Sequence, residues 1–303
     1  MKSGLIVVDK PPTMTSAAAV GIARRRLGDR KIGHCGTLDP SATGLLLLTL
    51  GRATRLTRFL IRAPKVYEGT ARLGVATDTY DMTGEVAAEK PIDGVTREAI
   101  DRVFDSFVGE YLQTPPPYSA KKVKGVKFYE LARRGEEVPA QASPVSVYEY
   151  RAAGDWQPGE DLGFVLGCAS GTYARSLVHD LGQQLGCGAA LATLRRTRIG
   201  PFRVSDAINL DHLRELTENE DDLGSAWIPF DDIPLPFGEM TADAQQERRI
   251  QHGQTVLVRD LEGREGDWVK VMNQRQQLIA VGAVVERIGS GNVGVVQPKV
   301  VFN

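Results

Sequence analysis

The amino-acid sequence predicts an α+β fold that ends in a small β-barrel. Apolar runs of strand length and segments of helical periodicity are mixed along residues 5–185. Between positions 206 and 243 there are 11 acidic residues and one basic residue, and prolines cluster near the end of this stretch, which is typical of a domain boundary. The short strand patterns beyond it are typical of a small barrel.

The first part of the chain predicts buried elements around a polar loop. Ser16 is expected to cap an alanine-rich helix that stops at Gly28. The unbroken apolar run at 44–50 predicts a buried strand, and the stretch before it, 33–43, is expected to be loop. The strands expected here are at residues 5–9, 44–50 and 65–75, and the helices are at 16–26 and 52–62.

The second part continues the mixture of helices and strands. The prolines at 115–117 exclude both a helix and a central strand there, so this segment is expected to be loop. Gly186 is expected to stop a helix that begins near residue 173. The other expected elements are a helix at 96–107, strands at 145–150 and 162–168, and, beyond the boundary, a helix at 241–250 and strands near 255–258, 268–272, 278–284 and 293–301.

Composition narrows the class of protein. With 303 residues, of which 42% are hydrophobic and 25% charged, the chain matches an ordinary globular protein rather than a disordered or disulfide-stapled one. The apolar run at 5–8 is too short for a signal peptide or a membrane span, so we expect a cytoplasmic location and no membrane contact. Three cysteines without CxxC spacing, at positions 35, 168 and 187, are expected to be reduced thiols.

The charge is distributed unevenly. The net charge is −1, which by itself argues mildly against nucleic-acid binding. Residues 1–75, however, hold 13 Lys and Arg against 4 Asp and Glu, whereas the remainder holds 24 against 34. A polyanion would therefore meet the first part of the chain favourably.

Taken singly, the polar residues of the 33–40 loop have ordinary interpretations. Asp39 precedes a proline and fits a turn carboxylate, and His34 fits a hydrogen-bonded structural imidazole. A thiol hydrolase that pairs His34 with Cys35 is not favoured, because adjacent side chains on an extended segment point to opposite faces. Neither GxGxxG nor GxxxxGK[ST] occurs, so no cofactor is expected, and no metal site is expected either.

Six blocks together carry a stronger signal. They are DKPPTMTS at 9–16, GHCGTLDP at 33–40, KVY at 65–67, the segment 113–133, GTYAR at 171–175 and LRRT at 194–197. In this order they resemble the TruB-type tRNA pseudouridine synthases, in their bacterial stand-alone form, which modify uridine 55 in the T-arm of tRNA. The chain departs from the family pattern at Thr13, where glycine is usual, and at Ala174, where a bulky aliphatic is usual.

The resemblance implies the pseudouridine synthase fold, a mixed and mainly antiparallel central sheet flanked by helices, followed by a PUA-like barrel. It implies a catalytic domain at 1–235, with an RNA-binding insertion at about 86–140, and an RNA-binding domain at 236–303. The implied partner is the T-arm stem-loop of tRNA, without an obligate protein partner. Because reactant and product are isomers, the reaction needs no redox carrier or ATP, which agrees with the absence of cofactor motifs.

The resemblance also implies the roles of individual residues. Asp39 is the nucleophile, Arg175 pairs with it, and Tyr67 stacks on the target base and helps to remove the C5 proton. An arginine suits this place because its guanidinium stays protonated when partly buried. Among the implied substrate-binding residues, His34 fills the stack left by a flipped-out base, and Tyr173 and Leu194 are walls of the pocket. Lys10, with Pro11, supports the loop that carries the nucleophile. Lys121, Lys122 and Lys124 contact phosphates of the RNA.

Two other functions are compatible with the sequence. One is an RNA-binding protein that mainly assists tRNA folding, and the other is a catalytic subunit that works only within a guide-RNA particle. Whether Asp39 attacks the base at C6 or the sugar at C1′, or whether a glycal forms, is left open by the sequence. The oligomeric state, further RNA targets and the contribution of the C-terminal barrel to affinity are left open too.

Overall fold

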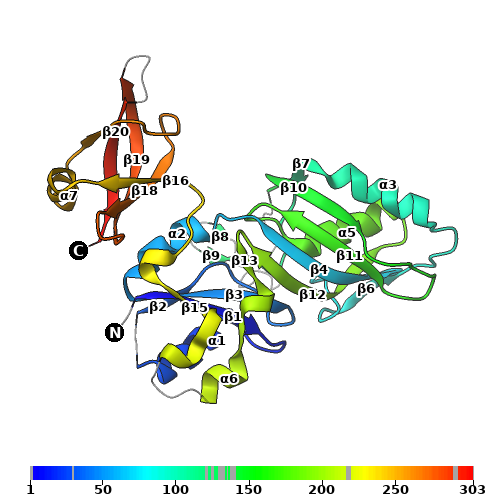
Figure 1. Ribbon diagram of the computed structural model, residues 1–303. Coiled ribbons are helices and arrows are strands. Elements are labelled where there is room, and N and C mark those ends of the chain that lie inside the picture. Colours follow the sequence, from blue (N-terminus) through cyan, green and yellow to red (C-terminus); the bar gives the residue numbers. More distant parts are fainter. Residues whose placement is uncertain are drawn as a thin grey trace.

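A computed structural model of the chain describes residues 3–28, 31–119, 122–123, 126–128, 134, 136, 141–215, 220–288 and 293–302 (Figure 1). Within these residues the chain forms one 11-stranded sheet, one five-stranded sheet and two two-stranded sheets. The predicted α+β class is therefore confirmed. No helix in this described part of the chain is long and apolar enough to cross a membrane.

The large sheet is mixed and mainly antiparallel, as predicted. Its only parallel neighbours along the described path are β1 with β14 and β3 with β12. The path runs in the order β14 (Ile208–Asn209), β1 (Gly4–Lys10), β3 (Thr43–Leu50), β12 (Ala189–Ile199), β4 (Lys65–Leu73), β11 (Leu162–Cys168), β10 (Ser143–Ala152) and β7 (Gly109–Gln113). Three short strands attach to it, namely β2 (Ile32–His34), β13 (Phe202–Arg203) and β15 (Trp227–Pro229).

Strands β1 and β3 are buried on both faces, which explains their unbroken apolar sequences. Alternate side chains of β1 enter different cores: Leu5 joins the core that contains Phe59, whereas Ile6 joins the core that contains Ala19 and Ala23. The helices of the two cores are α2 (Thr57–Leu60), preceded by the 3₁₀ turn η1 (Gly51–Leu56), on one face, and α1 (Ser16–Arg26) with α6 (Leu210–Glu215) on the other.

The other half of the sheet is covered by α3 (Arg97–Phe107) and α5 (Ala174–Leu185). Phe104 and Leu177 from these helices meet Tyr150 and Phe164 from the sheet in one apolar core. Helix α5 ends as predicted, because Gly186 takes a φ of 79° that favours glycine. The remaining described elements of this region are β5 (Val75–Thr77), β6 (Val86–Glu89), β8 (Lys122–Val123), β9 (Val126–Lys127), η2 (Val204–Asp206), η3 (Glu220–Ala226) and η4 (Phe230–Asp232).

Three local predictions are corrected by the structure. Thr15, not Ser16, caps α1, because its hydroxyl oxygen accepts the Ala18 N–H at 3.1 Å while Ser16 turns inward. His34 lies at the end of β2 rather than in loop, since this strand pairs with β3. Residues 189–199, for which no strand was expected, form β12 in the middle of the sheet. Several arginines in this strand interrupt the apolar pattern from which a buried strand is predicted.

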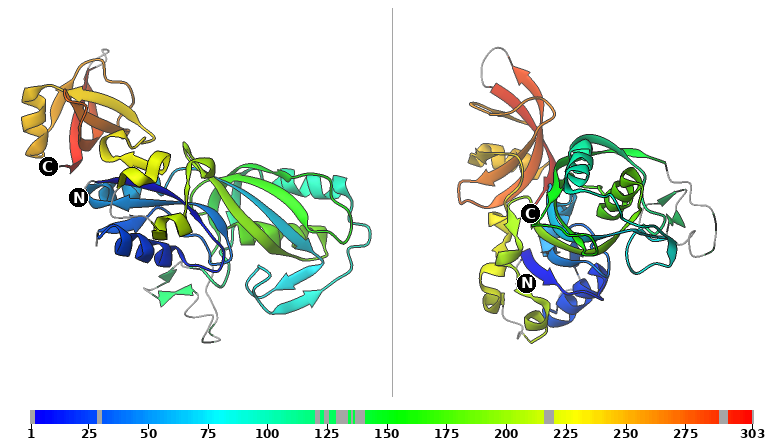
Figure 2. Two further views of the ribbon diagram at one scale, coloured as in Figure 1. Left: turned by 60° about the horizontal axis from the view of Figure 1, so that its bottom comes forward. Right: turned by 90° about the vertical axis from the view of Figure 1, so that its right-hand side faces the viewer.

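The five-stranded sheet forms a separate lobe, drawn orange to red at the upper left of Figure 1 and again apart from the large sheet in Figure 2. It curls around its own core of residues such as Ile250, Val271 and Val296. Its elements are β16 (Gly238–Ala242), α7 (Ala244–Gln251), β17 (Val256–Val258), β18 (Trp268–Asn273), β19 (Leu278–Ile288) and β20 (Val293–Val301). The barrel-like C-terminal part is confirmed, while the exact division at residue 235 and the insertion at 86–140 stay predictions.

Aromatic rings and one aspartate join this lobe to the large sheet. The Phe59 and Trp268 rings meet edge to face with centroids 4.9 Å apart, and Phe230 meets Phe302 at the same separation. The Asp231 carboxylate accepts the Leu278 N–H at 2.8 Å. The lobe therefore packs on the face of the large sheet that carries η1 and α2.

We predict that Gly182→Ala destabilises the protein by about 3 kcal/mol or more, because a Cβ at this position would lie 2.0 Å from the Ala189 nitrogen. The matched control is Gly21→Ala in α1, where the nearest atom to a Cβ is 3.7 Å away. That variant should gain about 0.5–1 kcal/mol, because alanine favours a helix interior. Denaturant unfolding measures both changes, and an equally stable Gly182→Ala protein would contradict the close packing of α5 on β12.

Candidate active site

A cavity of about 330 Å³ opens where the loop after β2, strands β4 and β12, and the beginning of α5 converge. Its lining includes residues 36–39 of the loop, Tyr67 from β4, Leu194 from β12, and residues 169–175 leading into α5. Five of the predicted site residues thus meet in one place, although they lie far apart in the sequence: Asp39, Tyr67, Tyr173, Leu194 and Arg175.

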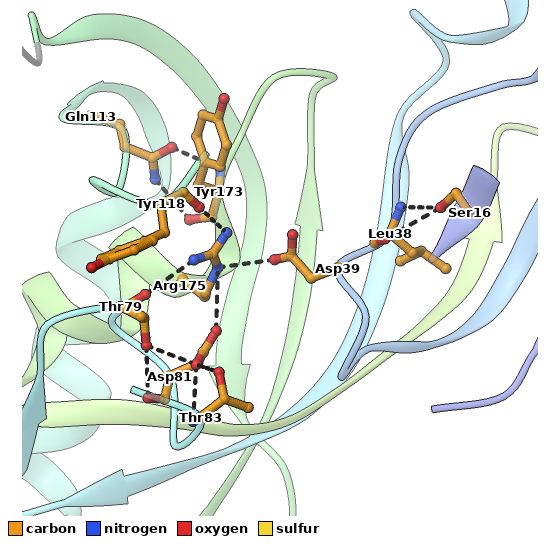
Figure 3. A network of polar contacts seen from close by, with 10 residues as sticks. All are labelled: Ser16, Leu38, Asp39, Thr79, Asp81, Thr83, Gln113, Tyr118, Tyr173 and Arg175. Carbon is orange, nitrogen blue, oxygen red and sulfur yellow. Dashed lines mark hydrogen bonds and ion pairs between the residues drawn. The ribbon is translucent and has the colours of Figure 1, made fainter. Parts of the chain in front are cut away.

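The loop that carries Asp39 is held from below by Ser16 and Lys10. The Ser16 hydroxyl accepts the Leu38 N–H at 2.9 Å and lies 3.2 Å from the Leu38 carbonyl oxygen, to which it donates (Figure 3). The Lys10 ammonium donates to the carbonyl oxygens of Met14 at 2.8 Å and Pro40 at 3.3 Å. The loop is therefore tied at positions directly before and after Asp39.

Lys10 is completely buried, so its charge has a strong influence on the site. Burial lowers the pKa of its ammonium to about 8, the nearby Asp39 carboxylate counteracts this fall, and Arg196 adds to it. The predicted support of the loop by Lys10 agrees with these contacts. It lies beneath the loop and does not line the cavity.

A second buried cation, Arg196, contacts the loop before Asp39. Its Nε donates to the Leu45 carbonyl at 2.7 Å and one Nη donates to the Gly36 carbonyl at 3.2 Å. Gly36 has a φ of 92°, which only glycine adopts readily, so the chain can turn here to present its carbonyl. The backbone on both sides of Asp39 is thereby fixed by hydrogen bonds from buried side chains.

Arg175 connects Asp39 to the rest of the site. Its Nε lies 2.9 Å from the Asp39 carboxylate, and the Arg175 side chain is 7% exposed while that of Asp39 is 40% exposed. The two Nη groups donate to the carbonyl oxygens of Thr79 at 3.1 Å and Tyr118 at 3.0 Å. Asp39 therefore has one oxygen held by a cation and a side chain that reaches open space, which suits a nucleophile.

The structure adds Asp81, a site residue that the sequence did not reveal. Its carboxylate lies 3.7 Å from the Arg175 Nε, the same atom that contacts Asp39, and it is buried (Figure 3). The second Asp81 oxygen accepts the Thr79 hydroxyl at 2.9 Å and the Thr83 N–H at 3.0 Å. In the sequence, the residues at 77–81 indicated only a turn, and no local signal connects them with Arg175.

Tyr67 and Leu194 form walls of the cavity. Tyr67 lies opposite Arg196 in the pairing of β4 with β12, and Leu194 lies opposite Gly69. Burial raises the pKa of the Tyr67 phenol, and the Arg196 guanidinium opposes this rise. The phenol is therefore protonated at neutral pH, so its flat neutral ring is available for stacking.

Tyr173 is held by Gln113, a second residue without a predicted role in the site. The Gln113 side chain accepts the Tyr173 N–H at 2.8 Å and donates to the Tyr173 carbonyl at 3.1 Å. Gln113 is almost fully buried at the end of β7. This reciprocal pair fixes the backbone where the loop enters α5, two residues before Arg175.

The remaining predicted residues are not brought into the cavity. His34 lies outside its lining, and burial, with help from Arg196, lowers the pKa of the imidazole, so the ring is neutral at pH 7. Lys121 and Lys124 lie outside the described residues, and for Lys122 only the backbone, in β8, is described. Among the residues that the structure describes, no group of three His, Cys, Asp or Glu side chains is placed to hold a metal ion.

Comparisons with known proteins identify the family. A family model described as "TruB family pseudouridylate synthase (N terminal domain)" matches residues 24–174, and one described as "tRNA pseudouridylate synthase B C-terminal domain" matches residues 175–233. The chain belongs to the TruB family of pseudouridine synthases. It is thus an enzyme of the isomerase class, as the six sequence blocks predicted.

Curated TruB relatives match most of the chain. A protein named tRNA pseudouridine synthase B from Solibacter usitatus is 40% identical over 93% of this chain and 96% of its own length. The one from Aromatoleum aromaticum is 47% identical over 70% of this chain and 68% of its own length. The archaeal box H/ACA Nop10–Cbf5 complex contains a chain with a similar fold, with a TM-score of 0.74 and 26% identity over 99% of this chain and 86% of that chain.

We predict that Ser16→Ala lowers kcat about tenfold, because the Leu38 backbone loses its buried partner and the Asp39 loop loses its position. Thr15→Ala is the matched control, since Thr15 caps the same helix without touching the loop. Both variants should lose about 1–2 kcal/mol of stability. Kinetics and unfolding curves measured together test this, and equal kcat values for the two variants would contradict it.

Proposed function

We propose that the protein converts uridine 55 in the T-loop of tRNA into pseudouridine, with Asp39 as the nucleophile and the target base flipped out of the RNA. The observation that carries this proposal is the Asp39–Arg175 ion pair of 2.9 Å in a cavity walled by Tyr67 and Leu194. The names of the relatives, tRNA pseudouridine synthase B, support tRNA as the substrate. We place the reaction on the free chain, without a cofactor.

The chemistry explains why these groups suit the reaction. The N1–C1′ bond of the uridine breaks, the base turns, a C5–C1′ bond forms, and the C5 proton leaves while N1 regains one. A carboxylate can hold an intermediate covalently while the base turns. The Arg175 guanidinium holds one Asp39 oxygen at 2.9 Å, while the half-exposed carboxylate reaches the open part of the cavity, from which it can attack. Attack at C6, attack at C1′ and a glycal route all employ this pair.

Tyr67 stacks on the flipped base in this proposal, opposite the aliphatic wall of Leu194. Its raised pKa keeps the phenol neutral, so Tyr67 can take up the C5 proton only after its own proton has passed to another group, such as N1 of the base, with Arg196 stabilising the phenolate. A cavity of about 330 Å³ suits a single nucleotide base with part of its sugar. The base must leave the RNA stack to enter it, at a cost of roughly a few kcal/mol.

A basic cleft between the large sheet and the C-terminal lobe supports RNA as the partner. This cleft, of about 550 Å³, is lined by Arg55 and Arg58 from η1 and α2 and by Lys299 from β20, and it shares Ile61 with the catalytic cavity. The Arg58 guanidinium lies 5.4 Å from the centre of the Trp268 ring. A phosphate backbone that leaves the cavity would therefore meet exposed cations from both parts of the chain.

We predict that Asp39→Asn lowers tritium release from a T-arm hairpin carrying 5-tritiated uridine by at least about a thousandfold, because the amide cannot act as the nucleophile. RNA affinity should stay within about twofold, since Asp39 is not needed for binding to phosphates. Asp101→Asn on α3 is the control, because this exposed carboxylate pairs with Arg97 on its own helix, at 2.9 Å, and does not line the cavity. It should keep full activity.

The parent protein in the same assay separates the alternatives. If it binds and refolds tRNA but releases no tritium, a folding assistant is the better interpretation. The likeness to the Nop10–Cbf5 complex favours a guide-RNA particle as the second candidate. Inactivity of the isolated chain on the bare hairpin, with activity restored by a guide RNA, would support that particle instead.

We predict that replacing Arg58 and Lys299 together by glutamine weakens tRNA binding and reduces the slope of log K against log salt by about 2, because two phosphate contacts are lost. The kcat at saturating tRNA should not change. Arg151→Gln is the control, since Arg151 on β10 pairs with Glu149 at 2.7 Å, away from this cleft. An unchanged salt slope in the double variant would exclude the cleft as an RNA contact.

A further inference from the structure

Tyr80 adopts an unusual backbone conformation close to the catalytic network. It lies in the loop between β5 and β6 with a φ of 65°, a value that residues other than glycine rarely adopt. Its ring stacks on the imidazole of His179, with ring centroids 3.8 Å apart and an angle of 12° between the planes. His179 belongs to α5, so the stack joins this loop to the helix.

Both ends of the stack are connected to Arg175. Thr79 and Asp81, the residues on either side of Tyr80, contact its guanidinium at 3.1 Å and 3.7 Å (Figure 3). His179 follows Arg175 by one helical turn on α5, which places the two side chains on the same side of the helix. The stack therefore fixes the distance between the helix that carries Arg175 and the loop that receives its hydrogen bonds.

The backbone of the loop is fixed to β12 at the same point. The Leu191 N–H donates to the Tyr80 carbonyl at 3.0 Å, and the Met82 N–H donates to the Leu191 carbonyl at 2.9 Å. Tyr80 thus cannot relax its backbone without breaking the pairing of its own carbonyl with β12. The conformation persists because its surroundings hold it.

Two energetically unfavourable features, a strained backbone and an unsatisfied polar atom, occur together at this contact. A glycine at position 80 would avoid the cost of positive φ, and the buried His179 Nδ1 has no hydrogen-bond partner within the described chain. Both rings face each other, and neither lines the catalytic cavity. A contact that is kept at the expense of backbone strain and an unsatisfied nitrogen indicates a function in positioning.

We propose that Tyr80 and His179 are positioning residues for catalysis. Their stack sets the orientation of the Thr79 carbonyl and the Asp81 carboxylate around Arg175, and Arg175 in turn places the Asp39 carboxylate. This inference rests on the proposed function of Asp39 as the nucleophile. Loss of the stack lets the loop shift relative to α5, which moves the attacking oxygen without removing any group that contacts RNA.

Tyr80→Gly tests the inference without disrupting the fold. The variant loses the stack but gains freedom at positive φ, so its melting temperature should stay within about 4 °C of the parent value. Its kcat on the T-arm hairpin should fall about 10- to 100-fold, because small displacements of reacting groups have effects of this size. The KM of Tyr80→Gly should stay within about twofold of the parent value. Tyr80→Phe, which keeps the ring, should have the same kcat as the parent.

A double-mutant cycle with His179→Ala tests whether loss of the stack is the cause of the fall in kcat. If the two rings act as a pair, Tyr80→Gly combined with His179→Ala should lower kcat no more than either change alone. Tyr111→Phe on β7 is the control, because it removes a 2.7 Å hydrogen bond to Asp180, which lies on the same helix as His179, and it should leave kcat unchanged.

Two results would overturn the inference. One is a kcat of Tyr80→Gly equal to that of the parent. The other is a fall in kcat in the double variant equal to the product of the falls measured in the two single variants. An inactive parent protein, by contrast, would overturn the proposed function itself, so the two failures can be told apart.

Discussion

The buried guanidinium of Arg175 has to be satisfied on every side, and the groups that satisfy it come from separate parts of the chain. Asp39 and Asp81 approach its Nε, while the carbonyls of Thr79 and Tyr118 accept from its two Nη groups. A buried charge without such partners would be strongly destabilising. The position of the Asp39 carboxylate is therefore a consequence of how one cation is accommodated among three other segments of the chain.

Other buried cations organise the backbone in a similar way. Lys10, Lys65 and Arg196 direct their N–H groups to main-chain carbonyls around the Asp39 loop and the end of α2. Burial lowers the pKa of both lysines to about 8, with Arg196 adding to the fall. Positive charge therefore collects beneath and beside the Asp39 loop, buried in the protein rather than on its surface.

The two sheets contribute different things to the proposed activity. The large sheet supplies a rigid platform, since β4 and β12 carry two walls of the cavity side by side in its centre. The C-terminal lobe supplies Lys299, which faces Arg55 and Arg58 across the basic cleft. Edge-to-face aromatic pairs such as Phe59 with Trp268 keep the lobe against the platform, so that the cleft proposed to bind RNA lies next to the cavity, with which it shares Ile61.

The sequence by itself determined the apolar strands, the α5 helix with its glycine stop, the TruB family, and Asp39, Tyr67 and Arg175 as members of one site, because these features are recorded in local patterns and ordered motifs. Only the tertiary structure decided that Ser16 supports the Asp39 loop and that Asp81 flanks Arg175. It also placed the arginine-rich β12 at the centre of the sheet and joined the rings of residues 80 and 179. The physical reason is that such contacts connect residues tens of positions apart, whose side chains are individually common in turns, caps and exposed strands.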